Sequence, residues 1–424
     1  MRDKVKRHLI GIGGVGMSAL ATALLRLGDE VTGADRTLGT PNVRFLESLG
    51  IRVCPDDGSG VDETTDEVIV STAIEETNAG LRKAKELGIP VTHRAKALAR
   101  ALSGYKLVAV VGTCGKSTVT AMLGHVLSEC GLDPMCVNGA NVPGWEGAVR
   151  FGKGAYAVAE VDESDRSLVA FRPYAAIVTN ASADHYSKEE MDEVFDAFVK
   201  DCDGPVVDGR RGSRGLEGLE GLEVPIPGAH NLQNARHAVL MAVALGVEPE
   251  KAIAAMKTFR GVERRLQLIT SQTSKPLEPL QLPPPAVYDD YAHNPEKLRA
   301  MWTTLSEKYP TGICVIWRPH GYAPLRKMLD ALAEMFAETV RPQDKLLLLP
   351  VYDAGGTTDR SINSDALVSR LQASASGDMR FARVSDLDAA YDWCAAHRDA
   401  FGAFVTCGAR DPGLPVLAKR LSEM

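Results

Sequence analysis

The chain has 424 residues, which is enough for two to four domains of the usual ~100–200 residues. Its hydrophobic content of 45% and charged content of 24% are typical of folded globular proteins. The net charge of -7 argues against a nucleic-acid partner or an anionic membrane surface, and no apolar run approaches the roughly 18–20 residues needed to cross a bilayer.

The N-terminal stretch MRDKVKRHLIGIGG predicts a strand over His8–Ile12, a glycine turn, a helix from about 18 to 27 and a strand over Val31–Ala34. The turn carries the G-x-G-x-x-G pattern, with Asp35 about 20 residues beyond it, in the strand–helix–strand context that the pattern requires. Such a turn binds a nucleotide diphosphate, as in dehydrogenases or in UDP-sugar enzymes, or it is simply a tight turn. The residues of this expected site are Gly11, Gly13, Gly14, Val15, Gly16 and Asp35.

Two further observations favour a cytoplasmic protein. The apolar patch after the basic N-terminus is too short for a signal peptide. The eight cysteines contain no C-x-x-C pair, so neither a disulfide framework nor a zinc site is expected. The α/β alternation then continues through strands near 67–71 and 89–92 and helices near 78–87 and 95–102, and we place a first domain boundary near Gly104.

The next segment predicts a phosphate-binding loop. A buried strand over Leu107–Val111 leads into GTCGKST, and a helix with apolar residues at helical spacing follows. A glycine turn that ends in Lys-Ser between a strand and a helix directs backbone N–H groups at phosphates. The loop is one glycine short of the usual P-loop pattern, because Val110 stands where that glycine belongs, and a structural glycine turn is the alternative.

Polar residues follow the next two predicted strands. The strand 155–161 ends in Glu160-Val161-Asp162-Glu163-Ser164-Asp165, and the strand 175–179 is followed by Asp184-His185. Acids at the carboxyl end of a strand beside a phosphate loop are where a Mg²⁺ ligand belongs, although a solvated charged loop has the same composition.

The repetitive glycine-rich stretch 209–223 predicts a surface loop. Asn231 and Asn234 then lie on one side of a predicted helix, where they either bind a base or cap the helix.

The last third predicts a second Rossmann-like sheet after a proline-rich linker at 275–285. Its expected strands, 286–288, 313–317, 345–349 and 404–406, each end in a polar loop, including YAHNP at 291–295 and RPHG at 318–321. We therefore predict three α/β domains, over 1–103, 104–262 and 263–424: an N-terminal Rossmann-like domain, a central P-loop ATPase-type domain and a C-terminal Rossmann-like domain.

The combined motifs resemble the Mur ligase family, and within it the branches that join L-alanine or a tripeptide to UDP-N-acetylmuramate. The resemblance rests on HLIGIGGVGMSALA, VSTAIEETN, GTCGKST, AEVDESD, TNASADH, GAHNLQNA, GVERRL, YDDYAHNP and RPHGY, and it covers nearly the whole chain. It implies an ATP- and Mg²⁺-dependent amide ligase of peptidoglycan precursor synthesis that forms an acyl phosphate. We expect a monomer or weak homodimer without a nucleic-acid partner.

The resemblance also implies roles for single residues. Lys116, Glu160, His185 and His293 would be catalytic, and Ser117, Glu160 and His185 would hold Mg²⁺. Tyr291, His293 and His320 would line the amino-substrate pocket. ATP would contact Gly112, Thr113, Cys114, Gly115, Lys116, Ser117, Thr118, Asn231, Asn234, Arg264 and Asp290.

Three departures from the family pattern concern the acceptor and the phosphate loop. Cys114 and Ser117 replace the histidine and threonine of the usual loop, and Asn294 stands where the alanine-ligase branch has histidine, as in folate polyglutamate ligases. Two arginines expected near His320 are absent, and Arg318 or Arg326 could substitute for them. The segment between His185 and His230 is short.

Alternative hypotheses are a Mur-type ligase for another amine or for a peptide or folate-like carboxylate, a catalytically silent UDP-sugar-binding paralogue, and an NAD-dependent oxidoreductase. The oxidoreductase leaves Lys116, Glu160 and His185 without a role.

Overall fold

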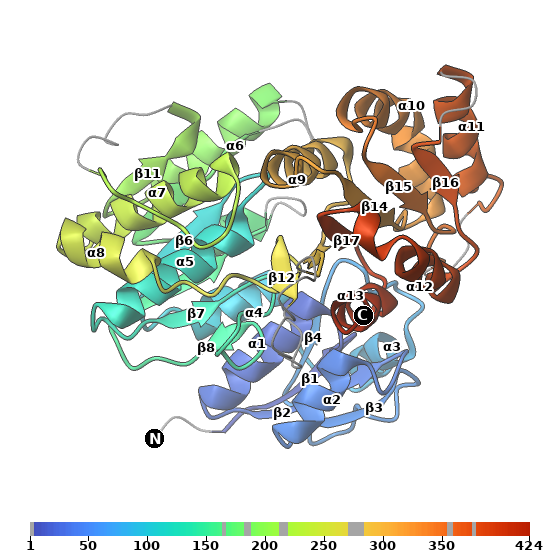
Figure 1. The fold of residues 1–424 in the computed structure, drawn as a ribbon. Helices are drawn as coiled ribbons and strands as arrows, with labels where there is room; N and C mark the ends of the chain where they lie inside the picture. The colour runs from blue at the N-terminus through green and yellow to red at the C-terminus, as the bar shows by residue number, and fades with distance from the viewer. Residues whose placement is uncertain are drawn as a thin grey trace. The chain divides into compact units, whose positions relative to one another are not determined.

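The computed structural model describes residues 4–162, 167–181, 188–211, 219–269, 284–353, 359–374 and 379–424. The chain divides into two compact units, one of residues 1–225 and 231–262 and the other of residues 226–230 and 263–424. Among the described residues, three sheets are found, two in the first unit and one in the second, and Figure 1 labels their elements. The predicted α/β fold class is confirmed, whereas the predicted boundaries at 103/104 and 262/263 stay predictions.

The first sheet has five parallel strands, and the middle one is β1, the strand before the glycine turn. Leu9 and Ile10 of β1 are both fully buried but belong to opposite faces, because neighbouring side chains of a strand alternate. The sheet order is β3 (Arg52–Pro55), β2 (Glu30–Asp35), β1 (Lys6–Ile10), β4 (Glu67–Val70) and β5 (Val91–His93). Its helices are α1 (Val15–Arg26), α2 (Pro41–Ser48), α3 (Ala79–Glu86) and α4 (Arg94–Ala101).

The second sheet is built around β6 (Lys106–Val111), whose last five residues are buried, as expected for a parallel strand covered on both faces. Its order is β11 (Val206–Asp208), β10 (Ala175–Val178), β6, β9 (Tyr156–Glu160), β7 (Met135–Val137) and β8 (Val149–Arg150). The helical elements are α5 (Lys116–Glu129), η1 (Ser167–Ala170), α6 (Lys188–Lys200), η2 (Gly209–Arg211), α7 (Ala229–Ala244) and α8 (Pro249–Met256). One apolar cluster joins α1 and α4 to this sheet, so the first two sheets share a core.

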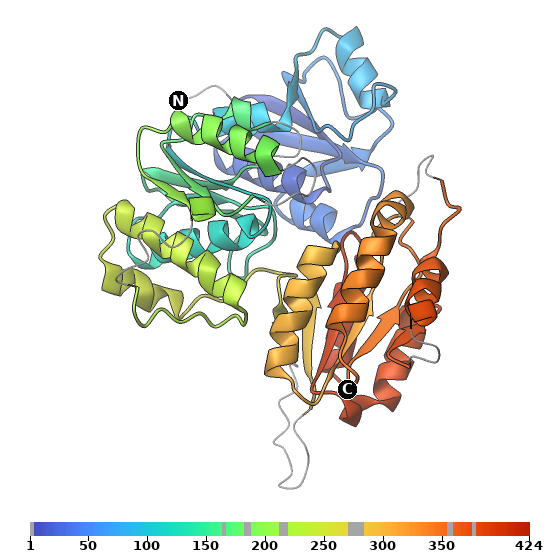
Figure 2. The ribbon, with the colours of Figure 1, turned by 90° about the horizontal axis from the view of Figure 1, so that it is seen from above.

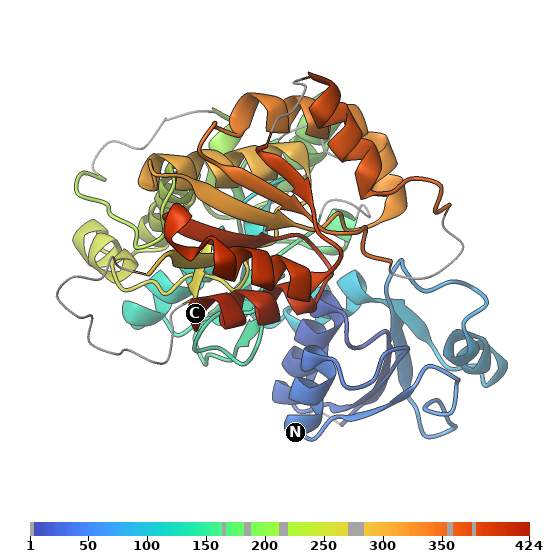
Figure 3. The ribbon, with the colours of Figure 1, turned by 45° about the vertical axis from the view of Figure 1, so that its right-hand side comes forward.

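The third sheet shows the alternation of side chains most clearly. Ile313, Val315 and Trp317 of β14 pack under α9 (Pro295–Lys308) and α10 (Tyr322–Thr339), on the face seen in Figure 2. Cys314 and Ile316 pack under α12 (Leu387–Ala396) and α13 (Gly413–Ser422), on the face seen in Figure 3. The order is β12 (Gln267–Ile269), β13 (Ala286–Asp290), β17 (Ala403–Cys407), β14 (Ile313–Trp317), β15 (Lys345–Leu348) and β16 (Phe381–Arg383), with α11 (Ser364–Ser374) and η3 (Arg398–Ala400) completing the unit.

Candidate active site

The glycine turn after β1 holds Asp35 against its own backbone. Gly11 adopts φ +73°, and the Gly11 and Ile12 N–H groups both donate to the Ala34 carbonyl at 2.8 and 3.1 Å. The Gly13 N–H donates to Asp35 Oδ2 at 2.8 Å, and a Cβ added to Gly13 would lie 2.9 Å from that oxygen. Only a glycine leaves room for this approach, so the turn and the acid predicted from sequence form one unit at the N-terminus of α1, where anions are stabilised.

Sequence analysis did not identify Arg94 as a site residue. It begins α4 directly after β5, and its Nη1 lies 3.1 Å from the position of a Cβ on Gly16. It also forms an ion pair with Asp162 at 3.5 Å, which links the first glycine turn to the acidic segment after β9. The sequence signal for this residue is a basic side chain at the carboxyl end of a predicted strand. Its proximity to Gly16 and Asp162 is seen only in the folded structure.

The phosphate loop is held by hydrogen bonds to the two residues that follow β10. Gly112 has φ +128°, and a Cβ there would lie 2.2 Å from Thr179 Oγ1. The Thr179 hydroxyl donates to the Cys114 carbonyl at 2.6 Å, and the Cys114 N–H donates to Asn180 Oδ1 at 2.9 Å. Lys116 Nζ donates to the Gly112 carbonyl at 2.7 Å, so the ammonium group lies across the mouth of the loop.

Asn234 touches the same loop. In the second turn of α7 it is buried, and its Oδ1 lies 2.6 Å from the position of a Cβ on Gly115, which has φ +85°. Its Nδ2 donates to Asn231 Oδ1 at 3.5 Å, which is a long hydrogen bond. Both asparagines predicted from sequence therefore lie beside the phosphate loop; their contact with adenine stays a prediction.

The expected metal ligands that are described supply oxygen. Ser117 is buried in the first turn of α5, and Glu160 ends β9, paired in register with Val110 of β6. Glu160 Oε2 accepts the Gly139 N–H at 2.8 Å, and the neighbouring Asn138 is buried with an Oδ1 that has no partner among the described residues. Hydroxyl, carboxylate and amide oxygens fit Mg²⁺, which prefers oxygen ligands.

His185, the third expected metal ligand, lies outside the described residues, as do residues 182–187 around it. Glu163, Ser164 and Asp165 of the acidic run lie outside them as well, and so does most of the predicted linker at 275–285. No cluster of three His, Cys, Asp or Glu side chains suited to a metal is found within the described ranges. A site completed by water and substrate phosphates, the usual arrangement for Mg²⁺, needs no such cluster.

Three neighbouring parallel strands of the second unit end at the same edge of the sheet. The residues predicted to line the amine pocket follow two of these strands. β17 lies between β13 and β14, with Cys407 in register with both Asp290 and Trp317. The His293 ring lies edge-to-face with Tyr291 at 5.6 Å and with His320 at 4.8 Å between ring centroids. The three residues expected to line the pocket are thus brought together.

Both histidines of this group are neutral at pH 7. Burial, helped by nearby cations, lowers the pKa of His293 and that of His320 to about 4. His293 Nδ1 lies 2.9 Å from the Tyr291 carbonyl. Because a carbonyl only accepts, Nδ1 carries the proton and Nε2 is left as a hydrogen-bond acceptor.

Asp290 and Arg264 form hydrogen bonds with other residues of the second unit. Asp290 accepts the Leu266 N–H at 2.6 Å and the Ala292 N–H at 2.7 Å, and burial raises the pKa of its carboxyl. Arg264 donates to Asp289 Oδ2 at 3.0 Å and to the Gly408 carbonyl at 2.6 Å. Burial raises the pKa of Asp289 to about 6, against the opposing charge of Arg264. Their roles toward ATP stay predictions.

The departures noted in the sequence have local explanations. Asn294 caps α9, since its Oδ1 accepts the Lys297 N–H at 3.0 Å, and asparagine is a favoured residue for that position. Arg318 is paired with Asp411 at 2.5 Å and Arg326 with Asp359 at 2.9 Å. Both suggested replacements for the missing arginines therefore already form an ion pair with an aspartate.

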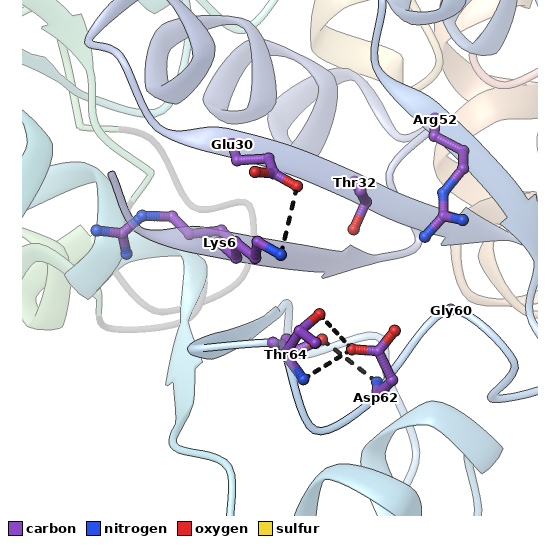
Figure 4. A pocket seen from close by; sticks show the side chains of 9 residues that line it. Lys6, Glu30, Thr32, Arg52, Gly60, Asp62 and Thr64 are labelled. Carbon is purple, nitrogen blue, oxygen red and sulfur yellow. Dashed lines mark hydrogen bonds and ion pairs between the residues drawn. The ribbon is translucent and has the colours of Figure 1, made fainter. Parts of the chain in front are cut away.

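A small cavity of about 40 Å³ lies at the opposite end of the first sheet (Figure 4). It is lined by the first residues of β1, β2 and β3 and by the loop before β4, whereas Gly11–Gly16 and Asp35 lie at the carboxyl ends. Lys6 and Glu30 pair with each other at 4.0 Å, and Asp62 is bonded to Thr64. Ligands of parallel sheets bind outside the carboxyl ends of strands, so we do not assign this cavity to the site.

Among the described helices, none combines the length and the apolar character needed to cross a membrane. The profile of the Mur ligase family, catalytic domain, matches residues 6–106, and that of the Mur ligase, glutamate ligase domain, matches residues 277–410.

Similar curated proteins include the UDP-N-acetylmuramate–L-alanine ligase of Paenarthrobacter aurescens (strain TC1), with 32% identity over 95% of this chain and 94% of that protein. The enzyme of the same name from Gloeobacter violaceus is 32% identical over 89% of this chain and 88% of its own length.

Two solved structures share the fold over nearly the whole of both chains. The UDP-N-acetylmuramate-alanine ligase MurC of Thermotoga maritima has a TM-score of 0.79 and 24% identity, covering 99% of this chain and 98% of that one. A murein peptide ligase from Psychrobacter arcticus 273-4 has a TM-score of 0.64 and 19% identity, covering 99% of each.

Proposed function

The chain belongs to the Mur ligase family, as predicted, and from that premise we propose that it joins L-alanine to UDP-N-acetylmuramate at the expense of ATP. The proposal rests on the 32% identity of this chain to a UDP-N-acetylmuramate–L-alanine ligase, an alignment that covers 94% of that ligase. A phosphate loop followed by an acidic strand end supports the ATP-dependent half of the reaction.

The phosphoryl step uses the residues around the phosphate loop. A carboxylate oxygen of UDP-N-acetylmuramate attacks the γ-phosphorus of ATP, the bond to the bridging oxygen breaks, and ADP leaves. Lys116 stabilises the charge on the outer phosphates, and its position across the loop mouth, 2.7 Å from the Gly112 carbonyl, suits that role. Mg²⁺ would be held by Ser117, Glu160 and, by the sequence prediction, His185, and it would neutralise charge on the transferred phosphoryl group.

The amide-forming step uses the polar ends of β13 and β14. The amine attacks the carbonyl carbon of the acyl phosphate, the bond from that carbon to the phosphate oxygen breaks, and phosphate leaves with the oxygen that came from the carboxylate and with the proton that the nitrogen loses. His293 accepts an N–H of the amine at Nε2, because Nδ1 is bonded to the Tyr291 carbonyl. With a pKa of about 4, His293 orients the amine rather than storing its proton at pH 7.

The UDP-sugar would bind at the glycine turn of the first sheet. The N-terminus of α1 and the Arg94 guanidinium both favour a diphosphate there. Asp35 keeps lone pairs for a ribose hydroxyl while accepting the Gly13 and Thr37 N–H groups. All eight cysteines are free thiols, which agrees with a reducing cytoplasm as the place of action.

The test is a product-mass panel. The protein is incubated with ATP, Mg²⁺ and UDP-N-acetylmuramate, together with single amino acids and with an L-alanine-containing tripeptide. The proposal predicts the mass of the alanyl conjugate and one phosphate per conjugate. A conjugate formed only with the tripeptide would assign the enzyme to the other branch, and ATP hydrolysis without any conjugate would refute a ligase.

A further inference from the structure

Arg410 has an unusual backbone conformation at the end of β17. Its φ is +68°, in the left-handed region that residues with a side chain rarely adopt, and the residue is exposed. Glycine takes this conformation without strain. Strained residues persist where the surrounding structure holds them, and they cluster at ligand sites, so Arg410 is a candidate for a functional side chain.

Strand order places Arg410 next to the amine pocket. Arg410 lies three residues beyond Cys407, and His320 lies three residues beyond Trp317, the register partner of Cys407. The two loops remain in contact beyond the strands, since the Arg318 N–H donates to the Cys407 carbonyl at 3.0 Å. After burial, the Arg410 charge is the largest influence that lowers the pKa of His320, which agrees with a guanidinium close to that ring.

Arg410 also differs from its neighbours in charge pairing. Arg264 is paired with Asp289 and Arg318 with Asp411. Within the described part of the chain, no carboxylate is paired with Arg410. A guanidinium that has no carboxylate partner among the described residues, beside two neutral histidines, is suited to bind the carboxylate of a ligand.

We propose that Arg410 binds the α-carboxylate of the incoming amino acid and thereby sets the acceptor specificity of the enzyme. The inference rests on the proposed function, since it needs an α-amino acid as acceptor. The amine of that acceptor lies at His293, and its carboxylate is attached to the same carbon. His293 and His320 are neutral at pH 7 and cannot balance the carboxylate, whereas a guanidinium binds it through two parallel hydrogen bonds.

The experiment compares L-alanine with L-alaninamide, which keeps the amine and the methyl group but lacks the carboxylate. Three variants are measured. Arg410→Gln removes the charge, and Arg410→Gly also removes the left-handed strain. Arg398→Gln is the matched control, because Arg398 lies in η3 before the start of β17, at the other end of the same strand.

For both Arg410 variants we expect kcat/KM for L-alanine to fall about 10- to 100-fold, the usual effect of losing a hydrogen bond to a charged group. For the same two variants, kcat/KM for L-alaninamide should change less than about threefold, and KM for ATP should stay constant. Arg398→Gln should leave all of these kinetic constants unchanged. Arg410→Gly should melt no lower than the wild type, because glycine suits φ +68°.

Two results would overturn the inference alone. One is an equal loss with L-alanine and L-alaninamide, and the other is a raised KM for ATP with unchanged discrimination between the acceptors. A wild-type enzyme that forms no product with either acceptor would instead overturn the proposed function, and this inference with it.

Discussion

Gly139→Ala should displace the Glu160 carboxylate without replacing any of the residues expected to bind substrate or metal. A Cβ at Gly139 would lie 2.4 Å from Glu160 Oε2 and 2.6 Å from both Cδ and Oε1. Ordinary contact begins near 3.4 Å, so the carboxylate must move by about 1 Å. A displacement of about 1 Å in catalytic machinery costs on the order of 100-fold in rate. The move also breaks the bond from the Gly139 N–H, at 2.8 Å, which contributes about 1.5–3 kcal/mol to holding the carboxylate.

The assay is phosphate release in the presence of UDP-N-acetylmuramate and L-alanine, measured over a range of Mg²⁺ concentrations. We expect kcat to fall about 100-fold and the Mg²⁺ requirement to rise, with the melting temperature nearly unchanged because Gly139 is exposed. Gly104→Ala is the control, since a Cβ there meets no atom within 4 Å. Wild-type turnover of Gly139→Ala at every Mg²⁺ concentration would show that the position of Glu160 does not matter to the reaction.

Three further predictions concern single residues. Lys116→Met should lower kcat by about 10³-fold, because it removes the charge that stabilises the outer phosphates, whereas the hydrogen bond that it loses to the Gly112 carbonyl lies within the loop itself; a loss below tenfold would contradict its role. Asn294→Ala should lower the free energy of unfolding by about 1 kcal/mol in urea titrations, through loss of the α9 cap, without changing the order of preference among amino acids. The pKa of buried His8 is lowered from 6.5 to about 4, so the unfolded state binds more protons between those values and stability falls as pH drops from 6.5 to 4. His8→Gln should flatten that pH dependence of the unfolding free energy, by on the order of 2–3 kcal/mol across the window.

The long central strands were predictable from sequence because their burial leaves a visible pattern. Leu107–Val111 is an unbroken apolar run since both faces of β6 are covered, and Ile313–Trp317 was predicted with the bounds that β14 has. The short strands β7, β8 and β16 were missed, because two or three residues are too few to show a period. The helix α2 was missed although it carries a signal, Thr40 as cap followed by Pro41.

The parts of the candidate site that lie within one short sequence motif could be predicted from the sequence. Gly13 and Asp35 meet as expected from the fingerprint, and Lys116 lies at its loop. Asn138 and Arg94 were not predictable, because their positions depend on strand order. β7 precedes β9 in the chain but pairs beside it, and that brings Asn138 and Gly139 to Glu160. The sequence also suggested a substrate-related role for Asn294, which stays a prediction, and the structure adds that its side chain caps α9.

The most direct test of the proposed reaction follows an oxygen atom. UDP-N-acetylmuramate labelled with ¹⁸O in both carboxylate oxygens is converted with ATP and L-alanine, and the released phosphate and the amide product are weighed. An acyl phosphate intermediate predicts one ¹⁸O in each phosphate and one in each amide carbonyl. Unlabelled phosphate formed together with the conjugate would contradict activation of the carboxylate by ATP.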